Sequence, residues 1–233
     1  MKINLFTIAI IVGLTGCASQ GTNTRSYVVG KPEKLNNEII IPEGSSSVWD
    51  VLVKNLSRSF FSINNIDKES RIINVSFSTQ KPSGYVDCGR THRTYTQGSN
   101  VEHYDYEVAE KSKFKAATTR QEHPAFVNYV IINRETSLEG KANIYVAPDD
   151  KNPKNSTIVT VNVRYILTIK TSGDAFAEHI SGSIQQRGST PTESNAFGFN
   201  TNKPETIDLP DGGSLTCFSK GLLESDILSL TKR

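Results

Sequence analysis

The 233-residue sequence is poor in the residues that most often carry chemistry, with three cysteines, four histidines, one methionine and one tryptophan. It also lacks an excess of either charge, because 26 Lys and Arg residues face 24 Asp and Glu residues. A nucleic-acid-binding domain usually presents a strongly basic face, so we expect no nucleic-acid partner. After residue 16, no apolar run approaches the roughly 20 residues that a membrane-spanning helix needs.

Common catalytic motifs are also missing. The sequence contains no Gly-x-Ser-x-Gly elbow, no phosphate-binding glycine loop, no His-Glu-x-x-His and no Cys-x-x-Cys. We therefore predict a non-enzymatic protein with no cofactor, no catalytic residues and no metal site.

The first 16 residues have the parts of a secretory signal peptide: Lys2, an apolar run over 3–14 and a small residue before the cleavage point. Leu14-Thr15-Gly16-Cys17 then resembles a bacterial lipobox. This resemblance implies cleavage before Cys17 and acylation of its thiol, and several acyl chains bind a lipid bilayer stably. The alternative is a secreted soluble protein with a cysteine near its cleavage site by chance.

Ala18 and Ser19 follow the cysteine. In Gram-negative lipoproteins an Asp directly after the cysteine holds the protein at the inner membrane. The resemblance thus implies a lipid-anchored protein on the periplasmic side of the outer membrane. In a cell with one membrane, it implies the extracytoplasmic side of that membrane.

Lipidation of Cys17 leaves Cys88 and Cys217 as a pair. In an oxidising compartment we expect these two residues to form a disulfide bond. The alternatives are a metal pair or a thiol nucleophile, but two cysteines without nearby ligand spacing make a poor zinc site.

The chain is expected to contain a signal peptide (1–16), a lipidated N-terminus with a flexible polar tether (17–38) and one domain (39–233). Apolar residues recur at three- and four-residue steps over about 47–60, which predicts a long amphipathic helix. A second, short helix is predicted over about 221–230. Alternating patterns over 71–79 and 157–170 predict strands, so the fold class is α+β, with a mostly antiparallel sheet packed on the long helix.

Two further segments are assigned from their composition. Residues 126–132 and 142–146 are predicted as two strands with 135–140 between them, and residues 181–206 are predicted to be rich in loops. The basic cluster Arg90-Thr91-His92-Arg93 is interpreted as a solvated loop, with an anion site as the less favoured alternative.

Part of the domain resembles the small periplasmic domains of BamC-type outer-membrane assembly lipoproteins. The shared pattern is Trp49-Asp50-Val51-Leu52, then Ile66-Asp67-Lys68-Glu69 and the strand Arg71–Thr79, about forty residues in all. The resemblance implies a helix held by an antiparallel sheet, behind a lipidated cysteine and a tether. It bears on the fold class and leaves the function open.

One region is a candidate binding surface. Tyr95, Tyr104 and Tyr106 offer aromatic side chains for a glycan or a peptide, and on a strand His103 and Asp105 would share one face. That face could hold a metal or a general base, although an exposed polar strand explains the same pattern, and tyrosines are common on half-exposed strands.

These observations predict a membrane-anchored envelope lipoprotein that presents a protein-binding surface, with other envelope proteins as partners in an assembly or accessory role. The alternatives are a lipoprotein that binds peptidoglycan or another glycan through the 95–107 region, and a hydrolase whose site no motif reveals.

Overall fold

The computed structural model describes residues 20–32, 34–118, 123, 125–208 and 213–232. The predicted signal peptide and Cys17 lie outside the described residues. Strands dominate what is described, and their bounds are β1 Thr22–Val28, β2 Glu38–Ile41, β3 Ser62–Asp67, β4 Ile72–Thr79, β5 Val86–Asp87, β6 Arg90–Gln97, β7 Asn100–Glu107, β8 Ser112–Ala117, β9 Phe126–Pro148, β10 Thr157–His179, β11 Ile184–Asn200, β12 Glu205–Asp208 and β13 Ser214–Ser219. The helices are α1 (Ser45–Leu56), α2 (Leu222–Ser229) and the single 3-10 turn η1 (Pro82–Gly84).

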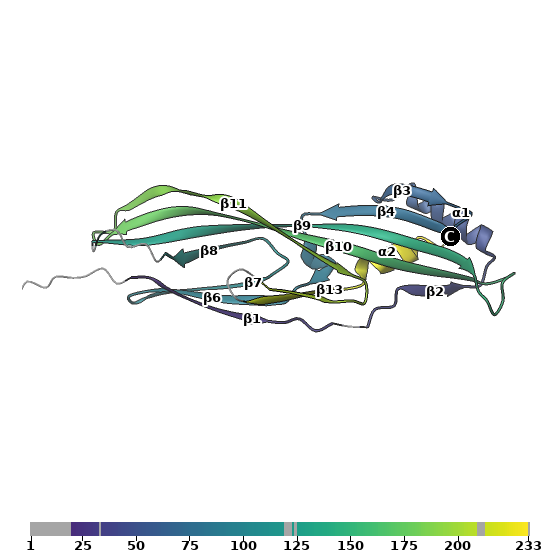
Figure 1. Cartoon of the computed structure of the whole chain (residues 1–233), viewed down its shortest axis with the longest axis horizontal. Helices are drawn as coiled ribbons and strands as arrows, with labels where there is room; N and C mark the ends of the chain where they lie inside the picture. The colour runs from purple at the N-terminus through teal and green to yellow at the C-terminus, as the bar shows by residue number, and fades with distance from the viewer. Residues whose placement is uncertain (1–19, 33, 119–122, 124, 209–212, 233) are drawn as a thin grey trace, which may run out of the picture.

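Two antiparallel strands of 23 residues, β9 and β10, form the axis of the molecule. At about 3.3 Å per residue, each extends over roughly 75 Å, which gives the body its elongated shape (Figure 1). They belong to a seven-stranded sheet with the order β11-β10-β9-β4-β3, in which β2 pairs with β10 and β8 pairs with β9. Two smaller sheets have the orders β1-β6-β7 and β12-β13-β5.

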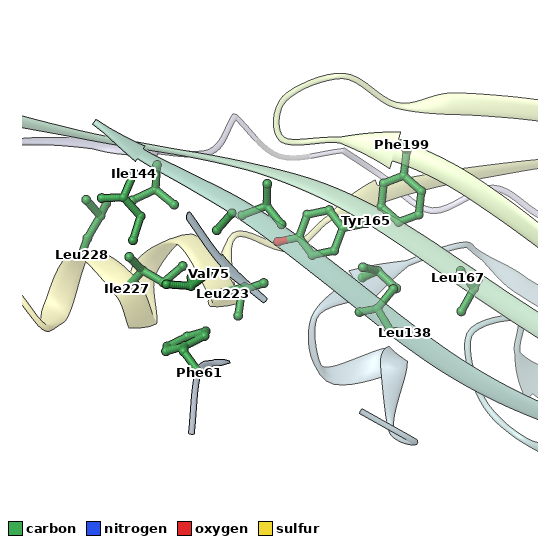
Figure 2. Close-up of a cluster of buried hydrophobic side chains, with 14 of the residues drawn as sticks. Phe61, Val75, Leu138, Ile144, Tyr165, Leu167, Phe199, Leu223, Ile227 and Leu228 are labelled. Carbon is green, nitrogen blue, oxygen red and sulfur yellow. The ribbon is translucent and has the colours of Figure 1, made fainter. Parts of the chain in front are cut away.

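The core lies on one face of the long sheet, because the strands alternate between buried and exposed residues. In β10, Val159, Val161 and Val163 are buried, whereas Asn162 and Arg164 are exposed. The residues of α1 and α2 that pack on this buried face are Val48, Trp49, Leu52, Leu56, Leu223, Ile227 and Leu228. Figure 2 shows the α2 side chains directed at sheet residues such as Val75 and Ile144.

The predicted fold class, α+β with the sheet packed on a long helix, is wrong. The described residues are 61% strand and 11% helical, and they form two short α-helices, with no long helix over about 47–60. Helix α1 has 12 residues and ends at Leu56. There the Ser59 hydroxyl donates to the Leu56 carbonyl and accepts from the Phe61 N–H, which replaces the next helical hydrogen bonds and turns the chain into β3. Helix α2 has eight residues and begins after Gly221.

Part of the expected tether over 17–38 is a strand. Residues 22–28 form β1, which pairs in antiparallel register with β6, from Thr22 opposite Thr96 to Val28 opposite Arg90. Its polar side chains are mostly exposed, so the stretch has no apolar pattern, and backbone pairing holds it in the sheet.

Two other expectations also differ from the structure. Residues 126–148 form one continuous strand instead of two, and the segment predicted to be rich in loops contains β11. Residues 184–196 are exposed, and Pro191 and Gly188 lie at this edge of the sheet, so side-chain burial gives no periodic signal there.

Two buried features join elements that lie far apart in the sequence. The expected disulfide between Cys88 and Cys217 is present and joins positions 129 residues apart. The Glu224 carboxylate of α2 is fully buried and accepts hydrogen bonds from the hydroxyls of Tyr165 (2.7 Å), Thr201 (2.7 Å) and Ser219 (3.1 and 3.2 Å). Within the described residues, no helix is long and apolar enough to cross a membrane.

Candidate binding site

The candidate surface at 95–107 is the β6–β7 hairpin, and strand alternation divides its residues between two faces. Tyr95 and Tyr106 are buried on the inner face, where Tyr104 is half-buried, whereas His103 and Asp105 are exposed on the outer face. The five residues therefore do not form one surface.

On the outer face, His103 and Asp105 each contact a residue of β6 instead of each other. Asp105 accepts a hydrogen bond from Arg90 at 2.6 Å and lies 3.4 Å from His92, and the His103 ring lies 3.1 Å from the Thr94 hydroxyl. In the described part of the chain, no group of three or more His, Cys, Asp or Glu side chains is arranged to hold a metal ion. This face is an exposed network of polar pairs.

On the inner face, a lysine lies among the tyrosines. The Lys115 ammonium is 4.0 Å from the ring centroid of Tyr129, 4.7 Å from that of Tyr95 and 3.5 Å from Glu102. Tyr104 donates to Glu102, and this hydrogen bond, followed by the nearby lysine, lowers the pKa of the Glu102 carboxyl. Burial raises the pKa of Tyr95 to about 12. Because these groups satisfy one another, the cluster is a packed structural contact between β6, β7, β8 and β9.

A cavity of about 240 Å³ lies further along the same inner face, between the β1-β6-β7 sheet and the long sheet. Three arginines from three strands line it: Arg25 of β1, Arg93 of β6 and Arg134 of β9. The other buried or partly buried lining residues are two threonines, Thr91 and Thr171, and six aromatic or aliphatic residues: Tyr106, Val108, Phe114, Ile169, Phe197 and Leu215. Glu193 and Asn195 lie at its exposed rim on β11.

Neighbouring side chains and backbone carbonyls hold the guanidinium groups of Arg93 and Arg134 in place. The Nε of Arg93 donates to the Tyr106 hydroxyl at 2.9 Å, and its Cζ lies 4.5 Å from the Phe114 ring centroid. Arg134 donates to the carbonyls of Val108 (2.9 Å) and Glu110 (3.2 Å) and to the Ser112 hydroxyl (3.2 Å). Its Cζ lies 5.1 Å from the Tyr106 ring centroid, so one tyrosine contacts both cations.

Positive charge is concentrated in this cavity. Among the described residues that line the cavity, Glu193 is the single acidic one, and no carboxylate oxygen lies within 4.0 Å of Arg93 or Arg134. Burial lowers the pKa of Arg134, and the neighbouring Arg93 and Arg25 lower it further. Two half-buried arginines, each with its guanidinium group over an aromatic ring and without a carboxylate partner, form a site suited to an anion.

A larger hollow of about 590 Å³ lies beside η1, but it has a different character. Its charged residues are of both signs and all exposed: Lys81, Glu110, Lys111 and Glu135. Because its charges are balanced and exposed to solvent, this hollow has no concentration of one charge that would attract a ligand, unlike the arginine-lined cavity.

Sequence reasoning missed the cavity. Its arginines lie at positions 25, 93 and 134, and the sheet brings them together because Arg25 pairs directly with Arg93 and Arg134 lies on the facing strand β9. The one local signal was the basic cluster at 90–93, which was interpreted as a loop. It is strand β6, and its alternation exposes Arg90 and His92 while directing Arg93 inward.

Comparisons of this chain with protein-family models, with curated proteins and with solved structures found no match.

Proposed function

We propose that this protein is a membrane-anchored, non-enzymatic envelope lipoprotein that presents a protein-binding surface to other envelope proteins. The anchor is the Leu14-Thr15-Gly16-Cys17 sequence, which resembles a lipobox. Strand β1 begins at Thr22, five positions after the cysteine. Five residues reach at most about 18 Å, so an acylated Cys17 would hold the start of β1 close to the bilayer.

That start lies at one end of the elongated body. The Asn23 side chain pairs with the backbone of Ala117 at the end of β8, with distances of 3.2 and 2.9 Å. The β10–β11 turn lies at the same end, and its Ile180 and Ile184 are exposed (Figure 1). This end would therefore face the lipid.

The opposite end carries an open apolar face, and this is the observation that carries the proposal. On the side of the long sheet away from α1 and α2, Ile40, Tyr145 and Ile72 are 62%, 44% and 37% exposed. They come from β2, β9 and β4, which lie at the end away from β1's start (Figure 1). The next row of the face is polar, with Asn74 donating to Asn143 at 2.5 Å.

Exposed apolar side chains with a polar surround have the composition of a non-obligate protein interface. A face turned away from the anchored end would meet proteins rather than the bilayer that holds Cys17. The glycan alternative has less support, because it depended on aromatic side chains at 95–107, of which Tyr95 and Tyr106 are buried.

Site-specific photo-crosslinking in intact cells tests the proposal. A photoreactive residue at Tyr145 or Ile40 should give the same discrete protein adduct, and Ile72→Lys should abolish it at both positions. The matched control is Lys170, which is exposed on the same side of β10 but outside the apolar rows and should give no such adduct. Equal labelling at all three positions, or retention of the purified protein on peptidoglycan with no adduct, would contradict a protein-binding face.

A further inference from the structure

The cavity between the two sheets has the size of a small ligand. An apolar protein cavity of about 150 Å³ holds benzene, and ordinary ligand sites begin near 300 Å³. At about 240 Å³, this cavity admits one ring or a short aliphatic chain together with a charged group. The exposed rim residues Glu193 and Asn195 place it next to solvent.

Its polar groups point to the charge of that ligand. Arg93 donates through Nε to Tyr106, and Arg134 donates three hydrogen bonds to Val108, Glu110 and Ser112, so the protein positions both groups. The terminal nitrogens of Arg93 have no acceptor in the described chain. Holding guanidinium groups together away from bulk water is costly unless a counter-charge joins them.

Its apolar groups point to the rest of the ligand. Phe114, Phe197 and Leu215 are buried side chains that line the same cavity as the arginines. A fully hydrated inorganic ion would gain nothing from these walls, whereas an apolar body would be removed from water.

We infer that this cavity binds a small organic oxyanion, a carboxylate or phosphate carried on an aromatic or short aliphatic body. The oxyanion lies between Arg93 and Arg134, and the body lies against Phe114 and Leu215. The site is independent of membrane anchoring, because every residue in it belongs to the folded body.

Isothermal titration calorimetry on the protein without its signal peptide tests the inference. The four probes are benzoate, phenyl phosphate, inorganic phosphate and benzyl alcohol. At least one aryl anion should bind with one-to-one stoichiometry. Benzyl alcohol lacks the charge and inorganic phosphate lacks the body, so each should bind at least about tenfold more weakly. Whichever of benzoate and phenyl phosphate binds more tightly identifies the head group that the site prefers.

Variants locate the binding. Arg93→Gln should weaken the aryl anion at least about tenfold, and Arg93→Lys should weaken it less because it keeps the charge but loses the planar fork. Arg187→Gln is the matched control, since Arg187 also lies over an aromatic ring, Phe126 at 5.5 Å, but outside the cavity, and it should bind as the wild type does.

Asn195→Trp covers the possibility that Arg93→Gln fails to fold. It changes an exposed rim residue and should block entry while leaving the circular dichroism spectrum unchanged. No saturable binding of either aryl anion to the wild type overturns the inference, and so does binding that survives in a folded Arg93→Gln or Asn195→Trp protein.

Discussion

Removing the hydroxyl of Tyr165 is a sharp test of how the C-terminal helix is held. The fully buried Tyr165 donates to Oε2 of Glu224 at 2.7 Å, and its oxygen lies 3.1 Å from the Ser219 hydroxyl. In Tyr165→Phe the ring and its packing against Phe199 remain, with ring centroids 5.4 Å apart in the wild type. The substitution therefore isolates the hydrogen bond to a buried carboxylate.

The expected cost follows from the character of that bond. A hydrogen bond to a charged group contributes about 1.5–3 kcal/mol, and its loss leaves the buried carboxylate with fewer donors. We expect Tyr165→Phe to lower the free energy of unfolding by about 2–3 kcal/mol, or roughly 4–12 °C in Tm for a chain of this size. Thr201→Val should cost a similar amount, and the double variant should be non-additive because both hydroxyls serve Glu224.

Urea unfolding followed by circular dichroism measures the effect. Tyr145→Phe is the control, because Tyr145 is exposed and should change stability by no more than about 0.5 kcal/mol. If Tyr165→Phe is as stable as this control, the Glu224 network does not stabilise the fold and the reasoning is refuted.

Further predictions concern pH and the disulfide. Burial raises the pKa of Tyr95 to about 12 and also raises that of Tyr165. A raised tyrosine pKa means that the folded state holds the phenol proton more tightly than the unfolded state does. The resulting stabilisation of the fold is complete below pH 10 and is lost as the pH rises towards and beyond 12. In an absorbance titration at 295 nm, Tyr95 and Tyr165 should therefore ionise only as the protein unfolds. If all eight tyrosines ionise near pH 10 while the fold remains intact, this prediction is contradicted. A Cys88→Ala/Cys217→Ala variant should lose up to about 4–5 kcal/mol, since the bond closes a loop of 129 residues. Urea unfolding of the wild type with reductant should show the same loss of unfolding free energy. If neither the double substitution nor the reductant lowers the unfolding free energy, the disulfide does not stabilise the fold.

Where the sequence predicted the structure well, residue periodicity coincided with burial. Residues of β4 and β10 alternate between the core and solvent, so a two-residue period was visible at 71–79 and 157–170. The disulfide followed from counting, since Cys88 and Cys217 remain once Cys17 is assigned to lipid.

Where the prediction failed, long-range pairing determined the structure. Strand β1 and the exposed part of β11 are held by backbone hydrogen bonds to β6 and β10, and their side chains bury too little to give a pattern. The helix expected to reach residue 60 stops at Leu56 because serine hydroxyls satisfy its last turn, an effect that apolar spacing does not reveal.

The cavity was invisible for a related reason. Arg25, Arg93 and Arg134 come from three strands and meet only through the pairing of β1 with β6 and the facing of the two sheets. The candidate residues at 95–107 were sought as one surface, but a strand directs neighbouring side chains to opposite faces. Tyr106 contacts the arginines, whereas Asp105 pairs with Arg90 and His92 on the other face.

The central claim, that the protein is held on a membrane through Cys17, is tested most directly by metabolic labelling with radioactive palmitate. If the proposal holds, the wild-type protein should incorporate the label and fractionate with membranes, because lipid on Cys17 would be its attachment. Cys17→Ser should lose the label and either remain uncleaved or become soluble. Label incorporation that is unchanged in Cys17→Ser would contradict the account.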